Sequence, residues 1–186
     1  CIWGPMVSAS LTILDSELLD KLPGKILAST GMDALTHAIE AYVCKAANPI
    51  TDGLALLAIQ MIQENILKAV KEHTPEALDA MLAASTMAGM AFGNSDVASV
   101  HSISEALGGF YDIPHGVANA MMLAPVSRLS IKGAPEKYAK VAKALGVDIT
   151  GMTTIEAANA GVDYIEKLSD QLEIPHFSEL EMVDPK

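Results

Sequence analysis

The apolar residues of this chain recur at intervals of three and four positions along most of its length. Such spacing places apolar side chains on one face of an α-helix, as in residues 30–44. The same pattern predicts further helices over residues 51–70, 75–92, 97–107, 115–125, 133–146 and 153–172. Residues 11–14 are a short β-prone run, and no alternating strand pattern follows them. We therefore expect an all-α fold, a helical bundle of seven or eight helices.

Capping and turn residues mark several helix boundaries. Thr30 and Asp33 have the spacing of a capping box, with aspartate in place of glutamate, so we place a helix start at Thr30. Thr74 followed by Pro75 predicts another start, with the proline in the first turn. Gly108–Gly109 predicts a helix end, because glycine readily adopts the left-handed conformation found there.

Composition and charge exclude several classes of function. Hydrophobic residues make up 51% of the 186 positions, which is enough for a sizeable core. The net charge of −11 repels phosphate backbones, so we expect no nucleic-acid partner. No apolar run approaches the length of a membrane helix, and the N-terminus has no basic signal region, so we expect no membrane partner. Two cysteines are too few for a disulfide framework, which favours a cytoplasmic setting.

Four polar residues in this apolar chain are candidates for a metal site. Asp33 and His37 lie four positions apart and share a face of one predicted helix. His101 and His115 flank a segment that contains two glycines and a proline, which permits the chain to fold back. One carboxylate and three imidazoles form a suitable ligand set for Zn²⁺ or Fe²⁺ and leave a position for a substrate oxygen.

Each of these residues also has a purely structural interpretation. From spacing alone, the favoured interpretation of Asp33 is a helix cap, and that of His37 is a core histidine whose nitrogens are satisfied. His101 and His115, taken singly, are explained in the same way. His73 and His176 lie beside prolines in polar connections, so we expect both rings to be solvated.

Four long segments resemble the iron-containing (group III) alcohol dehydrogenase family. They read GMDALTHAIEAY, NPITDGLALLAI, AGMAFGN and VHSISEALGGFYDIPHGVANAMMLAPV, and they occur in the family's order. The resemblance implies the helical bundle of the C-terminal domain in the dehydroquinate synthase-like and iron-containing alcohol dehydrogenase fold. It also implies that Asp33, His37, His101 and His115 bind one catalytic divalent metal, Fe²⁺ or else Zn²⁺.

One position departs from the family's pattern. The family has a second histidine four positions after the first in the segment that begins at Val100, and this chain has Glu105 there. The family's residue lies near the nicotinamide and the substrate. We therefore keep Glu105 as a catalytic candidate that borders the metal site without binding the ion.

The resemblance also implies how the chain is organised and what it works with. Residues 1–28 correspond to the interdomain junction and residues 29–186 to a helical metal-binding domain that ends before the family's own C-terminus. NAD or NADP is held in the family by an N-terminal nucleotide-binding domain with a glycine-rich segment, which this sequence lacks. The expected partners are that domain, a small alcohol or aldehyde substrate, and further copies of the chain in a homo-oligomer.

The implied activity is a metal-dependent, NAD(P)-linked oxidation of alcohols and reduction of aldehydes. This chain by itself is expected to be inactive, because it has no pyrophosphate-binding segment. Two alternatives stay open. One is a polyol (glycerol-type) dehydrogenase or a dehydroquinate synthase-like enzyme on the same scaffold, and the other is a non-catalytic helical module.

Overall fold

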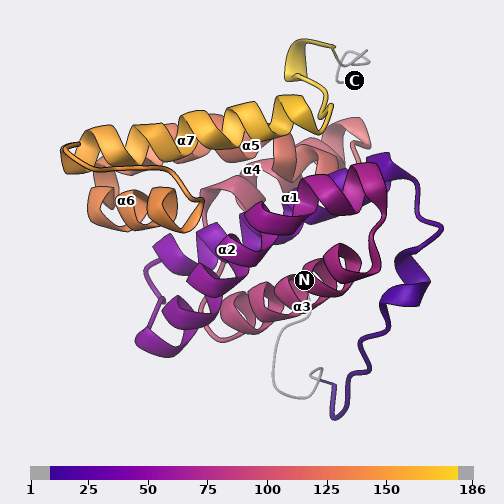
Figure 1. Cartoon of the computed structure of the whole chain (residues 1–186). Helices are drawn as coiled ribbons and strands as arrows, with labels where there is room; N and C mark the ends of the chain where they lie inside the picture. The colour runs from indigo at the N-terminus through magenta and orange to yellow at the C-terminus, as the bar shows by residue number, and fades with distance from the viewer. Residues whose placement is uncertain (1–8, 180–186) are drawn as a thin grey trace.

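The computed structural model describes residues 9–179 and shows an all-α architecture (Figure 1). The α-helices are α1 (Gly24–Val43), α2 (Pro49–Glu72), α3 (Pro75–Gly93), α4 (Ser99–Tyr111), α5 (His115–Ser130), α6 (Pro135–Ala144) and α7 (Thr154–Gln171). The 3₁₀-helices are η2 (Ser16–Leu19), η3 (Ile131–Gly133) and η4 (Phe177–Glu179). Residues 9–179 contain no strand, which confirms the predicted fold class.

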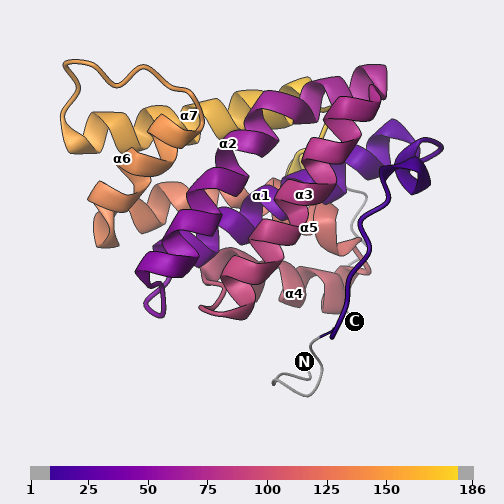
Figure 2. The same ribbon diagram turned by 60° about the horizontal axis from the view of Figure 1, so that its bottom comes forward.

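Helix α1 is the central element of the bundle. It contacts α2 and α3, which pair with each other, and it contacts α5, which in turn packs on α4 and α7 (Figures 1 and 2). Buried residues occur all round α1, whereas α6 and α7 each bury one face. The largest fully buried side chains include Met32, Leu35, Ile39, Ile59, Ile62, Ile66, Leu78, Leu123, Ile165 and Leu168. Removal of this apolar surface from water supplies most of the stability of the bundle.

The first long helix starts earlier than the capping pattern predicted. Helix α1 begins at Gly24 after Pro23, and Thr30 lies inside it with Oγ1 2.8 Å from the carbonyl oxygen of Ile26. The predicted capping box of Thr30 and Asp33 is therefore wrong, which leaves the Asp33 carboxylate available for other contacts. Helix α1 also crosses the point between residues 28 and 29 where we divided the chain, and residues 1–8 lie outside the described residues. That division stays a prediction.

The helix that carries His101 ends later than the glycine pair predicted. Gly108–Gly109 lies within α4, which continues to Tyr111 and ends at Asp112 with a left-handed φ of 55°. The N–H of Asp112 donates to the carbonyl of Gly108 over 3.0 Å, which closes the last turn. The reversal toward α5 therefore occurs over residues 112–114, not in a glycine loop.

A proline inside α5 did not end that helix. We expected the helix to stop near Pro125, and it continues to Ser130. Pro125 lacks an N–H and cannot complete one helical hydrogen bond. Val126 and Ser127 directly after it are buried, so tertiary packing holds this part of the chain helical. The helix start predicted at Thr74 is confirmed, since Thr74 accepts a hydrogen bond from the N–H of Ala77 at the start of α3.

One described helix, α2, is long and apolar enough to cross a membrane by length and composition alone. The sequence pattern predicted this helix over residues 51–70, and polar residues interrupt its apolar run. In the bundle, the apolar face of α2 contributes Ala58, Ile59, Ile62 and Ile66 to the core, all of them fully buried.

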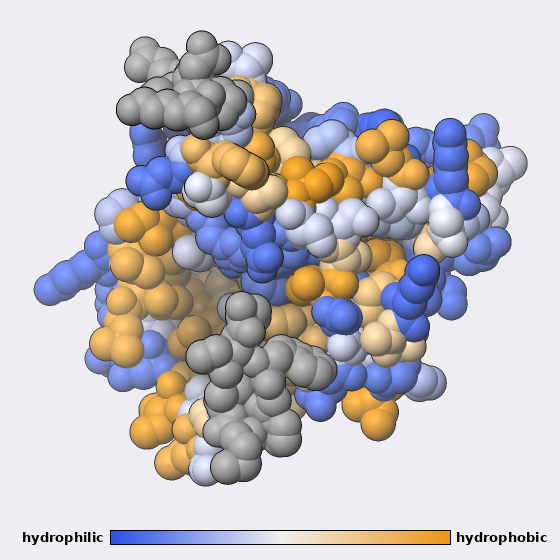
Figure 3. Space-filling view, turned by 180° about the vertical axis from the view of Figure 1, so that it is seen from behind, coloured by the Kyte–Doolittle hydropathy of each residue, from blue (hydrophilic) through white to orange (hydrophobic). Residues whose placement is uncertain are grey.

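Apolar side chains are also exposed on the surface of the molecule. The side of the bundle seen from behind carries several apolar patches (Figure 3). The most exposed large apolar residues of the described chain are Leu11, Ile13, Leu18, Ile50, Phe110 and Leu129. Exposed apolar area of this kind is available for contact with other protein surfaces.

Candidate metal centre

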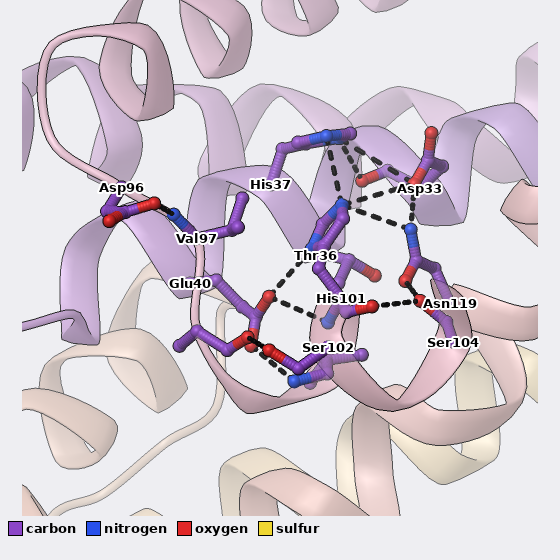
Figure 4. A network of polar contacts seen from close by, with 12 residues as sticks. Asp33, Thr36, His37, Glu40, Asp96, Val97, His101, Ser102, Ser104 and Asn119 are labelled. Atoms are coloured by element: carbon purple, nitrogen blue, oxygen red, sulfur yellow. Dashed lines mark hydrogen bonds and ion pairs between the residues drawn. The ribbon is translucent and has the colours of Figure 1, made fainter. Parts of the chain in front are cut away.

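Three helices bring the four predicted ligands to one place. Helix α1 contributes Asp33 and His37 from successive turns, α4 contributes His101, and α5 contributes His115 at its first position. One potential ligand atom from each of the four lies within 4.8 Å of the others. Figure 4 shows Asp33, His37 and His101 directed toward one another. The tertiary fold therefore assembles the set that the sequence singled out.

The separations between these atoms match the dimensions of a single tetrahedral ion. Nε2 of His37 is 3.0 Å from Nε2 of His101, and Oδ1 of Asp33 is 3.9 Å from the same His101 atom. Oδ1 of Asp33 is 3.7 Å from Nε2 of His115. A tetrahedral ion with bonds of about 2.1 Å holds its ligand atoms roughly 3.4 Å apart. The residues therefore fit a dication such as Zn²⁺ or Fe²⁺.

The hydrogen bonds of two imidazoles fix which nitrogen is free. Nδ1 of His37 lies 2.9 Å from the backbone carbonyl oxygen of Asp33, and Nδ1 of His101 lies 2.6 Å from Oε2 of Glu40. Both partners are acceptors, so each Nδ1 must carry the proton and donate. In the neutral rings the two Nε2 lone pairs then face each other. Burial lowers the pKa of His37 more than the charge of Asp33 raises it. Protonation of His37 is therefore disfavoured in this site.

Glu40 is a member of the site that sequence reasoning missed. Its side chain is buried, and its carboxylate accepts from the N–H of Val100 over 2.7 Å and from the N–H of His101 over 3.2 Å. Burial by itself raises the pKa of Glu40, but the hydrogen bonds from the His101 ring and from backbone N–H groups together lower it. A signal was present in the sequence, since Glu40 lies one turn after His37 in an apolar stretch.

Asn119 also belongs to the cluster and was missed. Its Nδ2 is 2.6 Å from Oδ1 of Asp33, 3.0 Å from Nε2 of His115 and 3.1 Å from Nε2 of His101. Its Oδ1 accepts a hydrogen bond from the hydroxyl of Ser104. Asn119 lies one turn after His115 and is fully buried, so the spacing in HGVAN was the available signal. Its amide is the donor group that faces three acceptors of the cluster, Oδ1 of Asp33 and Nε2 of His101 and His115.

The cluster is open on one side. The side chain of His115 is 49% exposed, whereas that of His101 is 5% exposed. The ring of Phe92 stacks on that of His37 with centroids 4.4 Å apart and so covers another side. Within the described residues, the side of His115 is therefore the most exposed side of the cluster.

A glycine allows α5 to approach α1 at the site. A Cβ atom at Gly116 would lie 2.9 Å from the backbone oxygen of Ser29 and 3.6 Å from Cβ of Asp33. Backbone atoms cannot move away as a flexible side-chain end can. The glycine after His115 therefore fixes how closely His115 can approach Asp33.

Within residues 9–179, no hydrogen bond or ion pair joins the remaining predicted residues to the four candidate ligands. Glu105 is exposed on α4, and no hydrogen bond or ion pair of its carboxylate occurs within residues 9–179. Its catalytic role stays a prediction. The expectation that His73 is solvated was wrong, because its ring is half-buried with Nε2 3.0 Å from the carbonyl oxygen of Leu22. His176 is exposed as expected, beside the carboxylate of Asp170.

Known proteins are similar to this chain in both sequence and fold. Residues 27–185 match the family described as "Fe-containing alcohol dehydrogenase family, C-terminal". The chain is 45% identical to 1,3-propanediol dehydrogenase of Klebsiella pneumoniae over 167 residues, which are 89% of this chain and 43% of that protein. It is 39% identical to NAD-dependent methanol dehydrogenase of Bacillus methanolicus over 170 residues, which are 91% of this chain and 45% of that protein. A crystal structure of 1,3-propanediol oxidoreductase matches with a TM-score of 0.85 at 45% identity, over 87% of this chain and 42% of that one.

The fold and the site thus define an all-helical domain with an aspartate and three histidines at the meeting point of three helices. The chain belongs to the Fe-containing alcohol dehydrogenase family and matches its C-terminal part. This confirms the family and the fold class that the sequence motifs indicated. The chain spans less than half the length of the curated relatives named above.

Proposed function

We propose that Asp33, His37, His101 and His115 hold one divalent metal ion, Fe²⁺ or else Zn²⁺, as part of a metal-dependent, NAD(P)-linked alcohol dehydrogenase and aldehyde reductase. The observation that carries the proposal is the pair of facing Nε2 atoms of His37 and His101, 3.0 Å apart. With both Nδ1 atoms donating elsewhere, these atoms and Oδ1 of Asp33 are acceptors that converge on one space. A cation satisfies all of them at once.

Each residue of the proposed metal site would have a distinct role. A bound dication would lower the pKa of an alcohol hydroxyl and polarise an aldehyde carbonyl. Asp33 supplies negative charge that retains a dication, and the three imidazoles bind it in their neutral form. Phe92 shields the ring of His37 from one side, and the exposed edge of His115 leaves an approach for a small substrate.

The proposal extends to partners that lie outside this chain. The hydride acceptor is NAD or NADP, held by an N-terminal nucleotide-binding domain. The dehydrogenase relatives support this extension because they are about twice as long as the chain, and one of them is named NAD-dependent. The exposed apolar residues, such as Leu129 and Phe110, fit contact with that domain or with a second copy in a homo-oligomer. We keep a cytoplasmic location as part of the proposal.

The names of the relatives support a proposed substrate class. One of them is named for a diol and another for methanol, so we propose a small primary alcohol or diol and the corresponding aldehyde. The diol name keeps polyols among the candidates. The alternative is a purely structural helical module. A measurement of metal binding distinguishes that module from the proposed enzyme.

Isothermal titration of the chain with Zn²⁺, and with Fe²⁺ under anaerobic conditions, tests the metal site. We expect one ion per chain, and we expect His101→Ala and His115→Ala to weaken binding by at least about 100-fold. His176→Ala is the matched control, because its ring is exposed and far from the cluster in sequence. His73 is unsuitable, since its ring contacts the backbone of Leu22. Equal metal affinity in the His101 and His176 variants would refute the proposed site.

A further inference from the structure

The buried carboxylate of Glu40 joins two helices at the site. It extends from α1 and accepts three hydrogen bonds from donors of α4, although Glu40 and His101 are 61 positions apart in sequence. Only 2% of the surface of Glu40 is exposed, so water does not share these contacts. A buried carboxylate needs such partners, and here they belong to one helix terminus and one imidazole.

The two backbone contacts replace a missing helix cap. The N-cap residue of α4 is Ala98, which has no side chain that could accept a hydrogen bond. An N-cap side chain normally accepts from the second or third N–H of its helix. Those positions in α4 are Val100 and His101, and Glu40 accepts from both, with Oε1 and Oε2 respectively. Glu40 therefore performs from α1 the capping that Ala98 cannot perform.

The third contact fixes the state of an imidazole. Nδ1 of His101 donates to Oε2 of Glu40 over 2.6 Å, which leaves Nε2 unprotonated and directed at Nε2 of His37 (Figure 4). The same carboxylate thus sets where α4 begins, which tautomer His101 adopts, and how its ring is turned. Hydrogen bonds of this kind to a metal-binding histidine typically change metal affinity by about 10- to 100-fold.

We propose that Glu40 is a positioning residue of the metal centre that acts through His101, and that its capping of α4 and its orientation of the ring are two separable roles. This rests on the proposed function, in which His101 is a metal ligand. A carboxylate is required because three donors meet it. A glutamine at this position has a single acceptor oxygen, and its amide N–H groups would face the N–H donors of α4.

A pair of substitutions separates the two roles. Glu40→Gln removes the charge and disturbs both the cap and the ring contact. Adding Ala98→Ser provides a local N-cap for α4 without restoring the contact to His101. We expect the double variant to regain most of the melting temperature lost by Glu40→Gln. We also expect it to bind Zn²⁺ about 10- to 100-fold more weakly than the parent, with an altered visible absorption spectrum when Co²⁺ is bound.

The outcome distinguishes positioning from a purely structural role. If the double variant regains parental Zn²⁺ affinity together with its stability, Glu40 acts only as a helix cap and the inference is wrong. Ala98→Ser alone is the control for effects of the serine itself, and it should leave Zn²⁺ affinity unchanged.

A second measurement does not depend on metal binding or on how well the variants fold. In the metal-free parent, ¹⁵N NMR of the histidine rings should show His101 protonated at Nδ1. If His101 is instead protonated at Nε2, the inference fails even when the chain binds metal. If the parent binds neither Zn²⁺ nor Co²⁺, the proposed function fails, while the tautomer of His101 in the parent still tests whether Glu40 orients the ring.

Discussion

Nε2 of His37 lies 3.0 Å from Nε2 of His101, and each ring donates its other nitrogen to a fixed acceptor. Two lone pairs at this distance repel each other unless a cation or a proton lies between them. The backbone carbonyl behind His37 and the carboxylate behind His101 hold the rings in place, so the rings cannot turn away. This arrangement governs how the site responds to acid and to metal ions.

The stability of the metal-free chain should decrease as the pH falls below about 6.5, the ordinary pKa of histidine. The pKa of His37 is lowered in the folded chain, chiefly by burial, so the unfolded chain takes up this proton more readily. Its contribution to stability is therefore present above the unfolded pKa and is lost as the pH falls through the folded pKa. The pKa of Glu40 is also lowered, so a second loss should begin below about 4.5.

Urea unfolding followed by circular dichroism at pH 7.5, 5.5 and 4.0 measures this dependence. His37→Gln is the control, because it removes the titrating ring and should abolish the loss between pH 7.5 and 5.5. A parental urea midpoint that stays constant over that interval would contradict the assignment to His37.

Removal of metal should leave the helices intact. The large buried side chains of α1, α2, α3, α5 and α7 form a core that does not involve the four candidate ligands. Circular dichroism in the presence of a chelator should therefore stay strongly helical. Zn²⁺ at about 100 times its Kd should then add about 2.7 kcal/mol by mass action and raise the Tm. A random-coil spectrum after chelation would show that the metal is required for folding.

Gly116→Ala should destabilise the chain by about 1–3 kcal/mol, because the new Cβ would lie 2.9 Å from the backbone oxygen of Ser29. It should also weaken Zn²⁺ binding, since α5 carries His115 away from Asp33 as it shifts. Gly109→Ala is the matched control, because nothing lies within 4 Å of a Cβ there and the position is helical. That control should be more stable by about 0.5–1 kcal/mol. Equal effects of the two substitutions on the urea midpoint would argue against a close contact between α1 and α5.

Asp112→Gly should stabilise the chain by about 1 kcal/mol. Asp112 ends α4 with a φ of 55°, and a side chain is disfavoured in this left-handed region. Asp79→Gly is the comparison, since Asp79 is exposed within α3 and glycine there should be neutral or slightly destabilising. Differential scanning calorimetry of both variants measures the difference. A lower Tm for Asp112→Gly than for Asp79→Gly would show that the Asp112 side chain stabilises the helix end.

The sequence by itself determined the helical class, the approximate extent of most helices, the family and the four residues that converge. Helical spacing is a local property, because residues three and four apart share a face whatever surrounds them. Asp33 and His37 were therefore correctly placed side by side. The start of α3 at Thr74 and Pro75 was correct for the same reason, since a cap and its helix are neighbours in the chain.

Contacts between distant segments decided the rest. Pro125 stays inside α5 because the helix is packed on both sides of it, and Gly108–Gly109 stays inside α4 because the turn is made by Asp112. The role of Glu40 depends on donors 60 and 61 positions away, so its place one turn after His37 could mark it as a candidate but could not reveal its partners. Whether the N-terminus of α4 meets the carboxylate of Glu40 depends on how α1 and α4 pack. That packing is set by burial over the whole bundle and is therefore visible only in the tertiary structure.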